Sequence, residues 1–392
     1  MLTQTKPSAP RTEQLPDIDH IAMLIPILAG GGAEHVMLAL SEQFSRLGRR
    51  VDILTLDAHH PDSVRSNQLP DTVRLVDLAV SRSIAAIMPL ARYLRHEKPD
   101  ILLSTLHHAN LIAIAAGRIA GNTSPIVVRV PNPLSLIPDR ASKRDRIAKW
   151  LSRYLLPSAA GIIAVSQAVA DNLVDSLKLS PNQIEVIYNP VDVDKIRRLA
   201  TVAPTPELDI KPETPLVLGV GRLHPQKDFA TLIRAFAIVH QTQPAQLLIL
   251  GEGPERPRLA QLGHALGISD AIAMPGFIEN PYPIMQRAHV IVLSSVFEGY
   301  PNVLAEALAL GKPVISTDCA AAREILAEGR YGKLVPIGDA PALARAIVET
   351  LTSPAAEQES LRQGIIDQRI DVIAGQYLAT LARIRTMSLD NG

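Results

Sequence analysis

The stretch 297–317, FEGYPNVLAEALALGKPVIST, constrains the fold of this chain more than any other. The apolar run 289–295 just before it predicts a buried strand. Gly299 permits a sharp turn of the backbone, and Pro301 favours the first turn of a helix. Gly311 is expected to end that helix, and the apolar residues after it begin another strand. A strand, a helix and a strand in quick succession predict a parallel α/β sheet.

Two carboxylates accompany the start of this helix. Glu298 follows the first strand, and Glu306 lies within the helix. In a parallel α/β sheet, ligands bind at the carboxyl ends of the strands, where helix N-termini attract negative charge. Carboxylates accept paired hydrogen bonds from vicinal hydroxyls, and the helix N-terminus can take a phosphate. This combination predicts a sugar nucleotide as the ligand.

The two glutamates, separated by seven intervening residues and flanked by EGYPNVLAEALALGKPVIST, resemble the donor-sugar motif of family 4 of the retaining glycosyltransferases. The resemblance covers nearly the whole chain from Ile18. It implies two doubly wound Rossmann-like α/β domains that face each other across a cleft, the GT-B fold. Strands that alternate with helices twice along the chain predict the same two sheets.

The resemblance also implies roles for individual residues. Glu298 would hold hydroxyls of the donor sugar, and Glu306 would hold the ribose. Ile278, in the loop after the predicted strand 272–277, would lie near the base. Residues of the loop and first helical turn would support the sugar and the phosphate through their backbone: Gly299, Tyr300, Pro301, Asn302 and Val303.

A second candidate motif is GRLHPQKDF, which follows the predicted strand 216–220. Arg222 offers a bidentate fork and Lys227 a compact charge, so the pair suits the two phosphates of a nucleotide diphosphate. The alternative is an ordinary surface loop with two cations. The motif resembles the family's diphosphate motif, which implies that Arg222 and Lys227 neutralise the charge that builds on the departing diphosphate.

A glycine-rich turn joins the first predicted strand to the first predicted helix. Gly31 and Gly32 let a ligand approach backbone N–H groups closely, or they form a plain tight turn. The sequence GGAE resembles the family's loop that faces the donor diphosphate.

Two histidines follow the predicted strand 101–104. An imidazole titrates near neutrality and can hydrogen-bond sugar or phosphate oxygens, so His107 is a catalytic candidate and His108 its neighbour. The alternative is that they cap the helix predicted over 111–119. The family places a donor-contacting histidine at Thr105 of this chain, two and three residues earlier, so the resemblance assigns that role to neither histidine.

A basic amphipathic helix is predicted over 143–156. One face carries Arg146, Lys149 and Arg153, and the other carries apolar residues with Trp150 at the boundary. Such a helix attracts an anionic membrane surface or an acceptor phosphate. The alternative is that its apolar side packs on the sheet. Arg129, at the end of the strand predicted over 126–130, is a further candidate for acceptor or membrane contact.

The order of elements predicts five segments. A flexible tail, 1–17, precedes an N-terminal acceptor-binding domain, 18–199. The stretch 200–215 has four prolines among polar residues and predicts the linker. A nucleotide-sugar-binding domain, 216–368, follows. The resemblance implies that the last helix, 369–392, returns to the N-terminal domain.

Composition limits the classes of protein that fit. A length of 392 residues with 47% hydrophobic residues suffices for two domains with cores. Lys plus Arg equals Asp plus Glu at 39 each, so no overall charge indicates nucleic acid. The one cysteine, Cys319, excludes a disulfide within the chain. The sequence has no uninterrupted apolar run of about 20 residues, so it does not predict a membrane span. We therefore expect a cytoplasmic protein, with the inner face of a membrane as a further location.

Together these features predict a retaining glycosyltransferase. The donor would be a UDP-sugar such as a UDP-N-acetylhexosamine or UDP-hexose, and the acceptor a saccharide or lipid-linked saccharide in surface polysaccharide, lipopolysaccharide or glycan assembly. The resemblance implies no metal ion, and His107 and His108 lack neighbouring carboxylates at ligand spacing. The alternatives are an epimerase of the same fold, a phosphorylase, and a regulator that binds a nucleotide sugar without turning it over.

Overall fold

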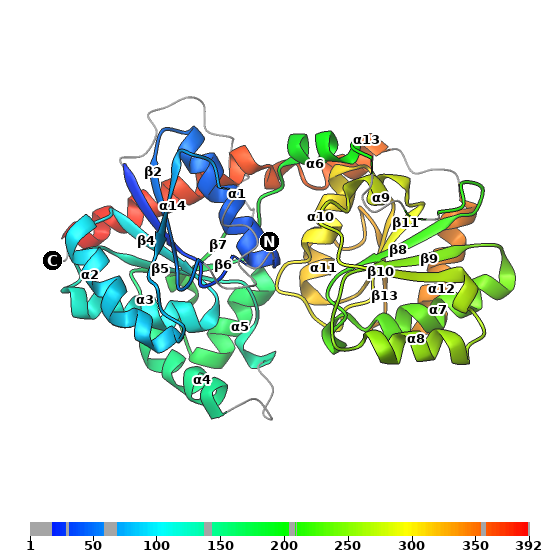
Figure 1. The fold of residues 1–392 in the computed structure, drawn as a ribbon, viewed down its shortest axis with the longest axis horizontal. Coiled ribbons are helices and arrows are strands. Elements are labelled where there is room, and N and C mark those ends of the chain that lie inside the picture. The colour runs from blue at the N-terminus through cyan, green and yellow to red at the C-terminus, as the bar shows by residue number, and fades with distance from the viewer. Residues whose placement is uncertain are drawn as a thin grey trace, which may run out of the picture. The chain divides into compact units, whose positions relative to one another are not determined.

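The computed structural model describes residues 18–28, 31–58, 69–136, 143–203, 208, 210–353 and 358–390; the predicted tail, 1–17, lies outside them. The chain divides into two compact units (Figure 1). Unit 1 contains the residues up to Val165, Val169–Pro190 and the residues from Ile370 onward. Unit 2 contains Ser166–Ala168 and Val191–Arg369. Each unit is built on one sheet.

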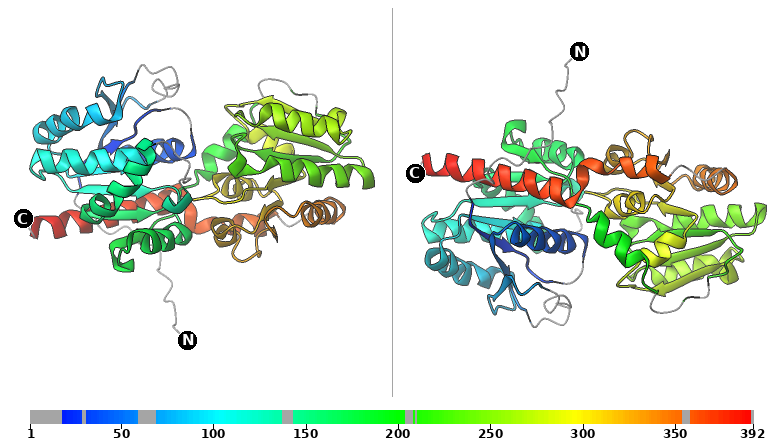
Figure 2. Two further views of the ribbon diagram at one scale, coloured as in Figure 1. Left: turned by 90° about the horizontal axis from the view of Figure 1, so that it is seen from below. Right: turned by 90° about the horizontal axis from the view of Figure 1, so that it is seen from above.

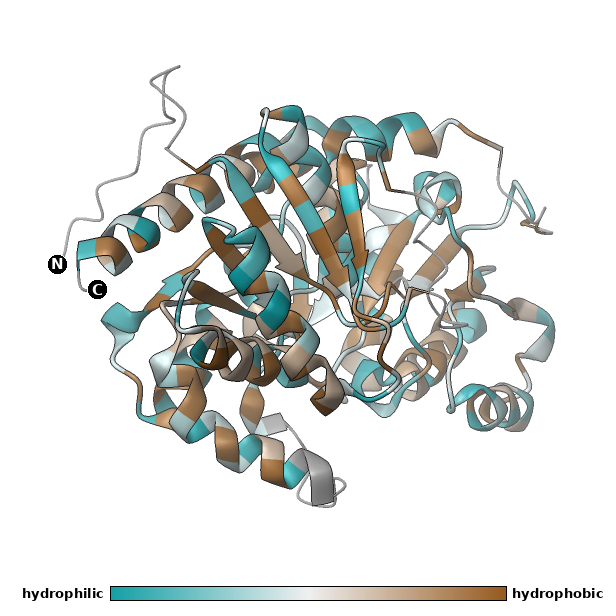
Figure 3. Ribbon diagram, turned by 60° about the vertical axis from the view of Figure 1, so that its left-hand side comes forward, coloured by the Kyte–Doolittle hydropathy of each residue, from teal (hydrophilic) through white to brown (hydrophobic). Residues whose placement is uncertain are grey.

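The sheet of unit 1 has seven strands in the order β3-β2-β1-β4-β5-β6-β7, and all its pairs are parallel. Strands buried on both faces are rich in apolar residues, as the brown colour in Figure 3 illustrates. The order reverses between β1 and β4, which is where an open parallel sheet places a ligand site. The strands are β1 (His20–Leu24), β2 (Arg50–Thr55), β3 (Val73–Asp77), β4 (Ile101–Thr105), β5 (Ile126–Val130), β6 (Gly161–Ala164) and β7 (Ile184–Val186).

Two sets of helices cover this sheet. Helix α1 (Gly32–Arg46) and helix α14 (Ile370–Asp390) pack together on one face, where Phe44 meets Tyr377 edge to face. Helices α2 (Ile87–Glu97), α3 (His107–Ala120) and α4 (Lys143–Leu155) are successive neighbours, as Figures 1 and 2 show. Right-handed crossovers place α1 and α3 on opposite faces, because they lead the chain in opposite directions across the sheet. Helix α5 covers Gln167–Leu177.

The sheet of unit 2 has six parallel strands in the order β10-β9-β8-β11-β12-β13, with the reversal between β8 and β11. Its core joins the sheet to the two longest helices of the unit, α7 and α12. The strands are β8 (Leu216–Val220), β9 (Gln246–Leu250), β10 (Ile272–Gly276), β11 (Val290–Leu293), β12 (Val314–Thr317) and β13 (Lys333–Val335). The helices are α6 (Val193–Ala200), α7 (Phe229–Thr242), α8 (Arg256–Ala265), α9 (Tyr282–Arg287), α10 (Asn302–Ala309), α11 (Ala320–Ile325), α12 (Ala340–Thr352) and α13 (Gln358–Gln363).

The predicted fold class, two doubly wound Rossmann-like α/β domains, is confirmed by the two sheets. The unit boundary differs from the predicted linker, since unit 2 already begins at Val191. Helix α6 packs on α9 and α10, so residues 191–200 belong to unit 2. The described residues of 200–215 therefore belong to unit 2 and do not mark the boundary between units.

Candidate functional site

The carboxyl ends of β8 and β11 bring the predicted cation and carboxylate of unit 2 together. The Lys227 ammonium lies 2.5 Å from Glu298 Oε1, and the Ser295 hydroxyl donates to the same oxygen at 2.5 Å. Glu298 is 9% exposed. Burying a carboxylate is costly unless charged and hydrogen-bonding partners surround it. Unit 2 therefore holds a buried carboxylate, with a charged partner and a hydrogen-bond donor, at the point where the strand order reverses.

Hydrogen bonds connect the two loops that form this site. The Val296 N–H donates to the Gln226 carbonyl at 2.8 Å, and the Gln226 side-chain amide donates to the Phe297 carbonyl at 3.0 Å. The Ser294 hydroxyl donates to the Lys227 carbonyl at 2.8 Å. Because these bonds link the loop after β8 with the loop after β11, the positions of Lys227 and Glu298 are coupled.

The loops after β8 and β9 also touch, and this contact requires glycine. A Cβ atom on Gly253 would lie 2.3 Å from the Leu223 carbonyl oxygen, closer than real Cβ contacts allow. Gly251 has φ +136°, and a Cβ atom there would meet the Gly221 carbonyl oxygen at 2.0 Å. In the sequence, Gly251 and Gly253 follow an apolar strand closely. This pattern was the available signal that the loop after β9 approaches the loop after β8.

Helix α10 starts directly after the loop that carries Glu298. Pro301 precedes its first residue, and the Asn302 N–H donates to the Tyr300 carbonyl at 3.0 Å. The Tyr300 hydroxyl donates to Gln368 at 2.9 Å in a buried position, so only its backbone is available to a ligand. Pro301 has no N–H group to donate. Val303 is buried in the first turn.

The remaining predicted donor-binding residues of unit 2 are Glu306, Arg222 and Ile278. Glu306 is half-buried on α10, and the Tyr282 hydroxyl lies 3.5 Å from its carboxylate. Arg222 is exposed, and within the described residues no side chain pairs with its guanidinium. Ile278 is buried after β10. Their donor contacts stay predictions.

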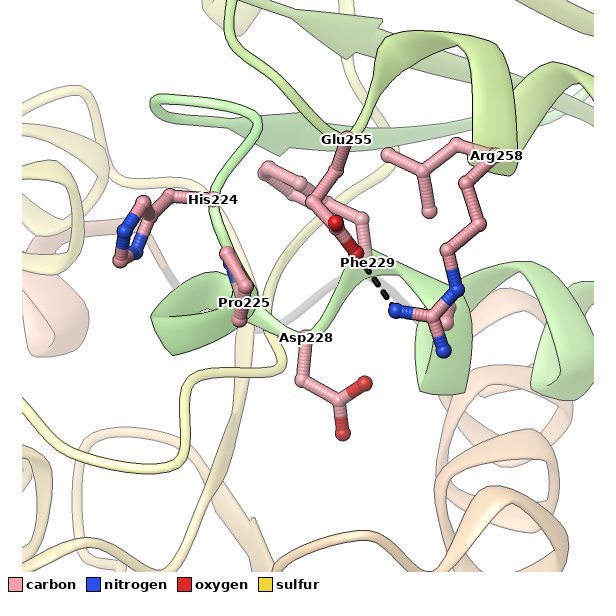
Figure 4. Close-up of a pocket in the computed structure, with 8 residues that line it drawn as sticks. His224, Pro225, Asp228, Phe229, Glu255 and Arg258 are labelled. Carbon is pink, nitrogen blue, oxygen red and sulfur yellow. Dashed lines mark hydrogen bonds and ion pairs between the residues drawn. The ribbon is translucent and has the colours of Figure 1, made fainter. Parts of the chain in front are cut away.

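A small cavity of about 70 Å³ lies beside the loop that carries Lys227. His224, Asp228 and Glu255 line it, and Figure 4 shows Glu255 paired with Arg258 across its rim. Asp228 caps α7 by accepting from the backbone and side chain of Thr231. The cavity is much smaller than the roughly 300–1,000 Å³ of small-molecule pockets, so it does not form a nucleotide site by itself.

Cys319 lies near Glu298 and Lys227, but it is not a nucleophile. Burial, reinforced by the negative charge of Glu298, raises the pKa of Cys319 to about 11. The thiol is therefore neutral at pH 7, and the thiolate is the reactive form.

In unit 1, both histidines begin helix α3. Helix α3 starts at His107, four residues before the predicted start. The His107 ring lies 3.4 Å from the Ser152 hydroxyl and meets the His108 ring edge to face. Gly31 is the N-cap of α1 and Gly32 its first residue. These residues occupy the carboxyl end of the sheet, and their contact with a donor stays a prediction.

The prediction that Arg129 contacts an acceptor or a membrane is wrong. Arg129 is fully buried, donates to Thr105 at 3.1 Å, and also donates to Asn189. Its side chain lies on the same face of β5 as Val127, the face covered by α1 and α14. Arg129 therefore connects β5, β4 and the segment that leaves unit 1.

The burial of the residues of α4 bears on the two interpretations of the basic helix. Among the residues of α4 whose burial is described, 146–155, Ala148 and Ser152 are buried. Ile147, Trp150 and Tyr154 are 58%, 56% and 62% exposed. The alternative, that the apolar side packs on the sheet, is therefore wrong for Ile147 and Tyr154, whereas Leu151 and Leu155 of the same side are half-buried. Arg146 and Arg153 are exposed as well, and Lys149 is half-buried.

The described part of the chain contains neither a membrane-spanning helix nor a metal cluster. Each of its helices is too short or too polar to cross a bilayer. Within this described part, no group of three His, Cys, Asp or Glu side chains lies close enough together to hold a metal ion.

Two family models match the chain. The model described as Glycosyltransferase Family 4 matches residues 30–195, and the model described as Glycosyl transferases group 1 matches residues 214–353. The first match lies in unit 1 and the beginning of unit 2, and the second lies within unit 2.

Curated relatives match over part of their length. The chain is 33% identical over 233 residues to N-acetylgalactosamine-N,N'-diacetylbacillosaminyl-diphospho-undecaprenol 4-alpha-N-acetylgalactosaminyltransferase of Campylobacter jejuni. This match covers 59% of this chain and 61% of the relative. It is also 33% identical to the lipopolysaccharide core biosynthesis glycosyltransferase LpsE of Rhizobium meliloti, over 44% of this chain and 48% of that protein. The chain thus spans less than two thirds of either relative.

Solved structures match over nearly the full length. The HepE protein of Anabaena, solved in complex with UDP and glucose, superposes with a TM-score of 0.75 at 22% identity. The match covers 93% of this chain and 99% of that chain. Likeness at this level of identity supports a common fold.

Proposed function

Because the chain belongs to the group 1 glycosyltransferases of family 4, with the GT-B fold, we propose that it is a retaining glycosyltransferase. It takes a sugar from a UDP-linked donor, a UDP-N-acetylhexosamine or UDP-hexose. It passes the sugar to a saccharide or lipid-linked saccharide. The name of the Campylobacter relative supports a lipid-linked acceptor, and the UDP complex of the Anabaena protein supports the nucleotide.

The observation that carries this proposal is the pair formed by Lys227 and the buried Glu298. It lies at the carboxyl ends of the neighbouring strands β8 and β11, where the strand order reverses. A carboxylate can accept hydrogen bonds from sugar hydroxyls, because each of its oxygens has two lone pairs. An ammonium beside it can take the negative charge that builds on the leaving diphosphate, which is the main electrostatic demand of the reaction. Arg222 adds a second cation, and Glu306 holds the ribose.

The proposed mechanism uses no covalent enzyme intermediate. Cys319 is neutral at pH 7 and does not supply a nucleophile. The leaving phosphate itself would help to deprotonate the acceptor hydroxyl on the same face of the sugar. The chain's own groups would bind, orient and neutralise, with His107 a further candidate at the donor. We propose that no metal ion is needed, which equal rates with and without a chelator would support.

The test of donor class is isothermal titration with UDP, GDP and ADP. We expect micromolar affinity for UDP that falls roughly 10- to 100-fold in Lys227→Ala, because a charge-assisted hydrogen bond to phosphate is lost. Lys211→Ala is the matched control, since Lys211 is exposed in the same unit and should bind UDP like the wild type. Failure of all three nucleotides to bind would favour the regulator. Conversion of UDP-sugars without any acceptor would identify an epimerase.

A second prediction concerns Ser295. Its hydroxyl donates to Glu298 at 2.5 Å, so Ser295→Ala should let the carboxylate turn and lower kcat roughly 10-fold. The affinity for UDP should stay within about twofold, because Ser295 does not contact Lys227 in the described structure. Steady-state kinetics with paired UDP titrations measure both quantities. An unchanged kcat would remove Ser295 from the positioning of Glu298.

A further inference from the structure

Helix α4 buries small residues, leaves Leu151 and Leu155 half-buried, and exposes three of its large apolar residues. Ala148 and Ser152 are 6% and 0% exposed. Ile147, Trp150 and Tyr154, spaced three and four residues apart, form one exposed row. The Trp150 and Tyr154 rings touch edge to face with centroids 5.1 Å apart, so the row is continuous. A soluble helix normally buries such residues.

The packing of α4 fixes this orientation. Ala148 and Ser152 are small enough to let α4 approach its neighbour α3 closely. The Ser152 hydroxyl donates to the Ala148 carbonyl at 2.8 Å and lies 3.4 Å from His107 of α3. Turning the apolar row inward would replace these contacts with side chains too large for the space. The exposed row is therefore a stable surface of unit 1.

Positive charge accompanies the apolar row. At 100° per residue, Arg146, Arg153 and Lys149 form a second row directly beside it. Helices α2, α3 and α4 together contain eight Lys and Arg residues and two acidic residues, whereas the whole chain has 39 of each sign. The excess is thus local to the helices on this side of the sheet.

We propose that α4 docks unit 1 on an anionic lipid bilayer. Trp and Tyr rings combine an apolar body with a polar edge and settle at the level of the headgroups. Ile147 adds apolar contact, and the basic row meets anionic headgroups. A second copy of the chain is the weaker fit, because a symmetric contact through this face would oppose like charges. The inference stands independently of the transfer reaction.

The test uses the chain's one tryptophan, Trp150, as its own reporter. The full chain is mixed with vesicles of phosphatidylcholine alone or with about one third phosphatidylglycerol. We expect roughly 10-fold or stronger sedimentation with the anionic vesicles, reduced by added salt. Trp150 emission should shift to shorter wavelength, and lipids brominated near the headgroup should quench it.

Variants separate this face from the rest of the surface. Arg146→Gln with Arg153→Gln should lower anionic binding roughly 10-fold, since each charge near the surface contributes. Arg234→Gln with Arg345→Gln is the matched control, because both arginines are exposed in unit 2. Tyr154→Ala should weaken binding, and Phe277→Ala, which removes an exposed aromatic ring of unit 2, should not. UDP titration and circular dichroism check that the variants are folded.

Two outcomes would overturn the proposal. One is equal sedimentation of the Arg146/Arg153 variant and the wild type. The other is vesicle binding that leaves Trp150 emission and quenching unchanged, since the contact would then lie elsewhere. Absence of vesicle binding together with intact UDP binding would reject the membrane surface while leaving the proposed transfer reaction in place.

Discussion

Replacing Glu298 with glutamine is expected to reduce sugar transfer by roughly 100- to 1,000-fold. The glutamine side chain has the same shape but carries no charge, and its amide nitrogen cannot accept hydrogen bonds. Lys227 and Ser295 each lie 2.5 Å from the same carboxylate oxygen, so both donors would lose their charged acceptor. The donor sugar would lose its carboxylate contact as well. The measurement is kcat/KM for the UDP-sugar at saturating acceptor.

The affinity for UDP separates a lost catalytic contact from a damaged fold. In the wild type, the Lys227 ammonium is neutralised by Glu298. In Glu298→Gln it is released from that partner, so UDP should bind as tightly as in the wild type or more tightly. Glu359→Gln, at an exposed glutamate of the same unit, is the matched control. Unchanged turnover would remove Glu298 from the site, and joint loss of turnover and UDP binding would indicate collapse of the loops.

The meeting of Lys227 and Glu298 was partly predictable from the sequence. Both residues follow apolar strands, and the carboxyl ends of parallel strands lie at one edge of a sheet. Which cation would pair with Glu298 was not predictable. Arg222 and Lys227 are five residues apart, and the turn at Pro225–Lys227 decides that only Lys227 points toward the carboxylate.

Arg129 illustrates why a strand residue can mislead. Its place at the end of β5 is typical of a ligand-binding cation, but side chains alternate between the faces of a strand. Its face is covered by α14, which begins at Ile370, far along the chain. No local pattern around Arg129 reports that distant helix. The buried position follows from a contact that only the folded chain contains.

The basic helix illustrates the limit of periodicity. A helical wheel shows that α4 has an apolar side but not which side packs inward. The small residues Ala148 and Ser152, four apart, were the available signal, because small side chains permit close approach of helices. The same argument explains how a helix can bury Ala148 and Ser152 and leave Trp150 exposed.

A second large effect is expected in unit 1, at a buried carboxylate on β2. Asp52 is fully buried, and accepts from His20 at 2.9 Å and from Tyr93 at 2.5 Å. The Arg74 guanidinium donates to both of its oxygens, at 3.0 and 2.6 Å. Burial alone would raise the pKa of Asp52, but the hydrogen bonds from His20, Arg74 and Tyr93 hold it well below its usual range. Asp52 is therefore ionised in the folded protein at every physiological pH.

Asp52→Asn should lower the free energy of unfolding of unit 1 by about 3–5 kcal/mol at pH 7, because it leaves buried donors without their charged acceptor. Asp175→Asn, at an exposed position of the same unit, should change it by less than about 0.5 kcal/mol. Urea unfolding followed by Trp150 emission measures both, since Trp150 lies in unit 1.

The pH dependence of the difference in unfolding free energy between the wild type and Asp52→Asn identifies the cause of that difference. A carboxylate whose pKa is depressed on folding contributes stability that is fully present above the unfolded pKa of about 3.9 and is lost as the pH falls below it. The gap between wild type and Asp52→Asn should therefore be constant from pH 7 to about pH 5. Below about pH 4 it should narrow by roughly 1.4 kcal/mol for each pH unit. A gap that stays constant down to about pH 3 would mean that the substituted amide disturbs packing rather than charge. The ionised Asp52 would then no longer explain the stability of this sheet.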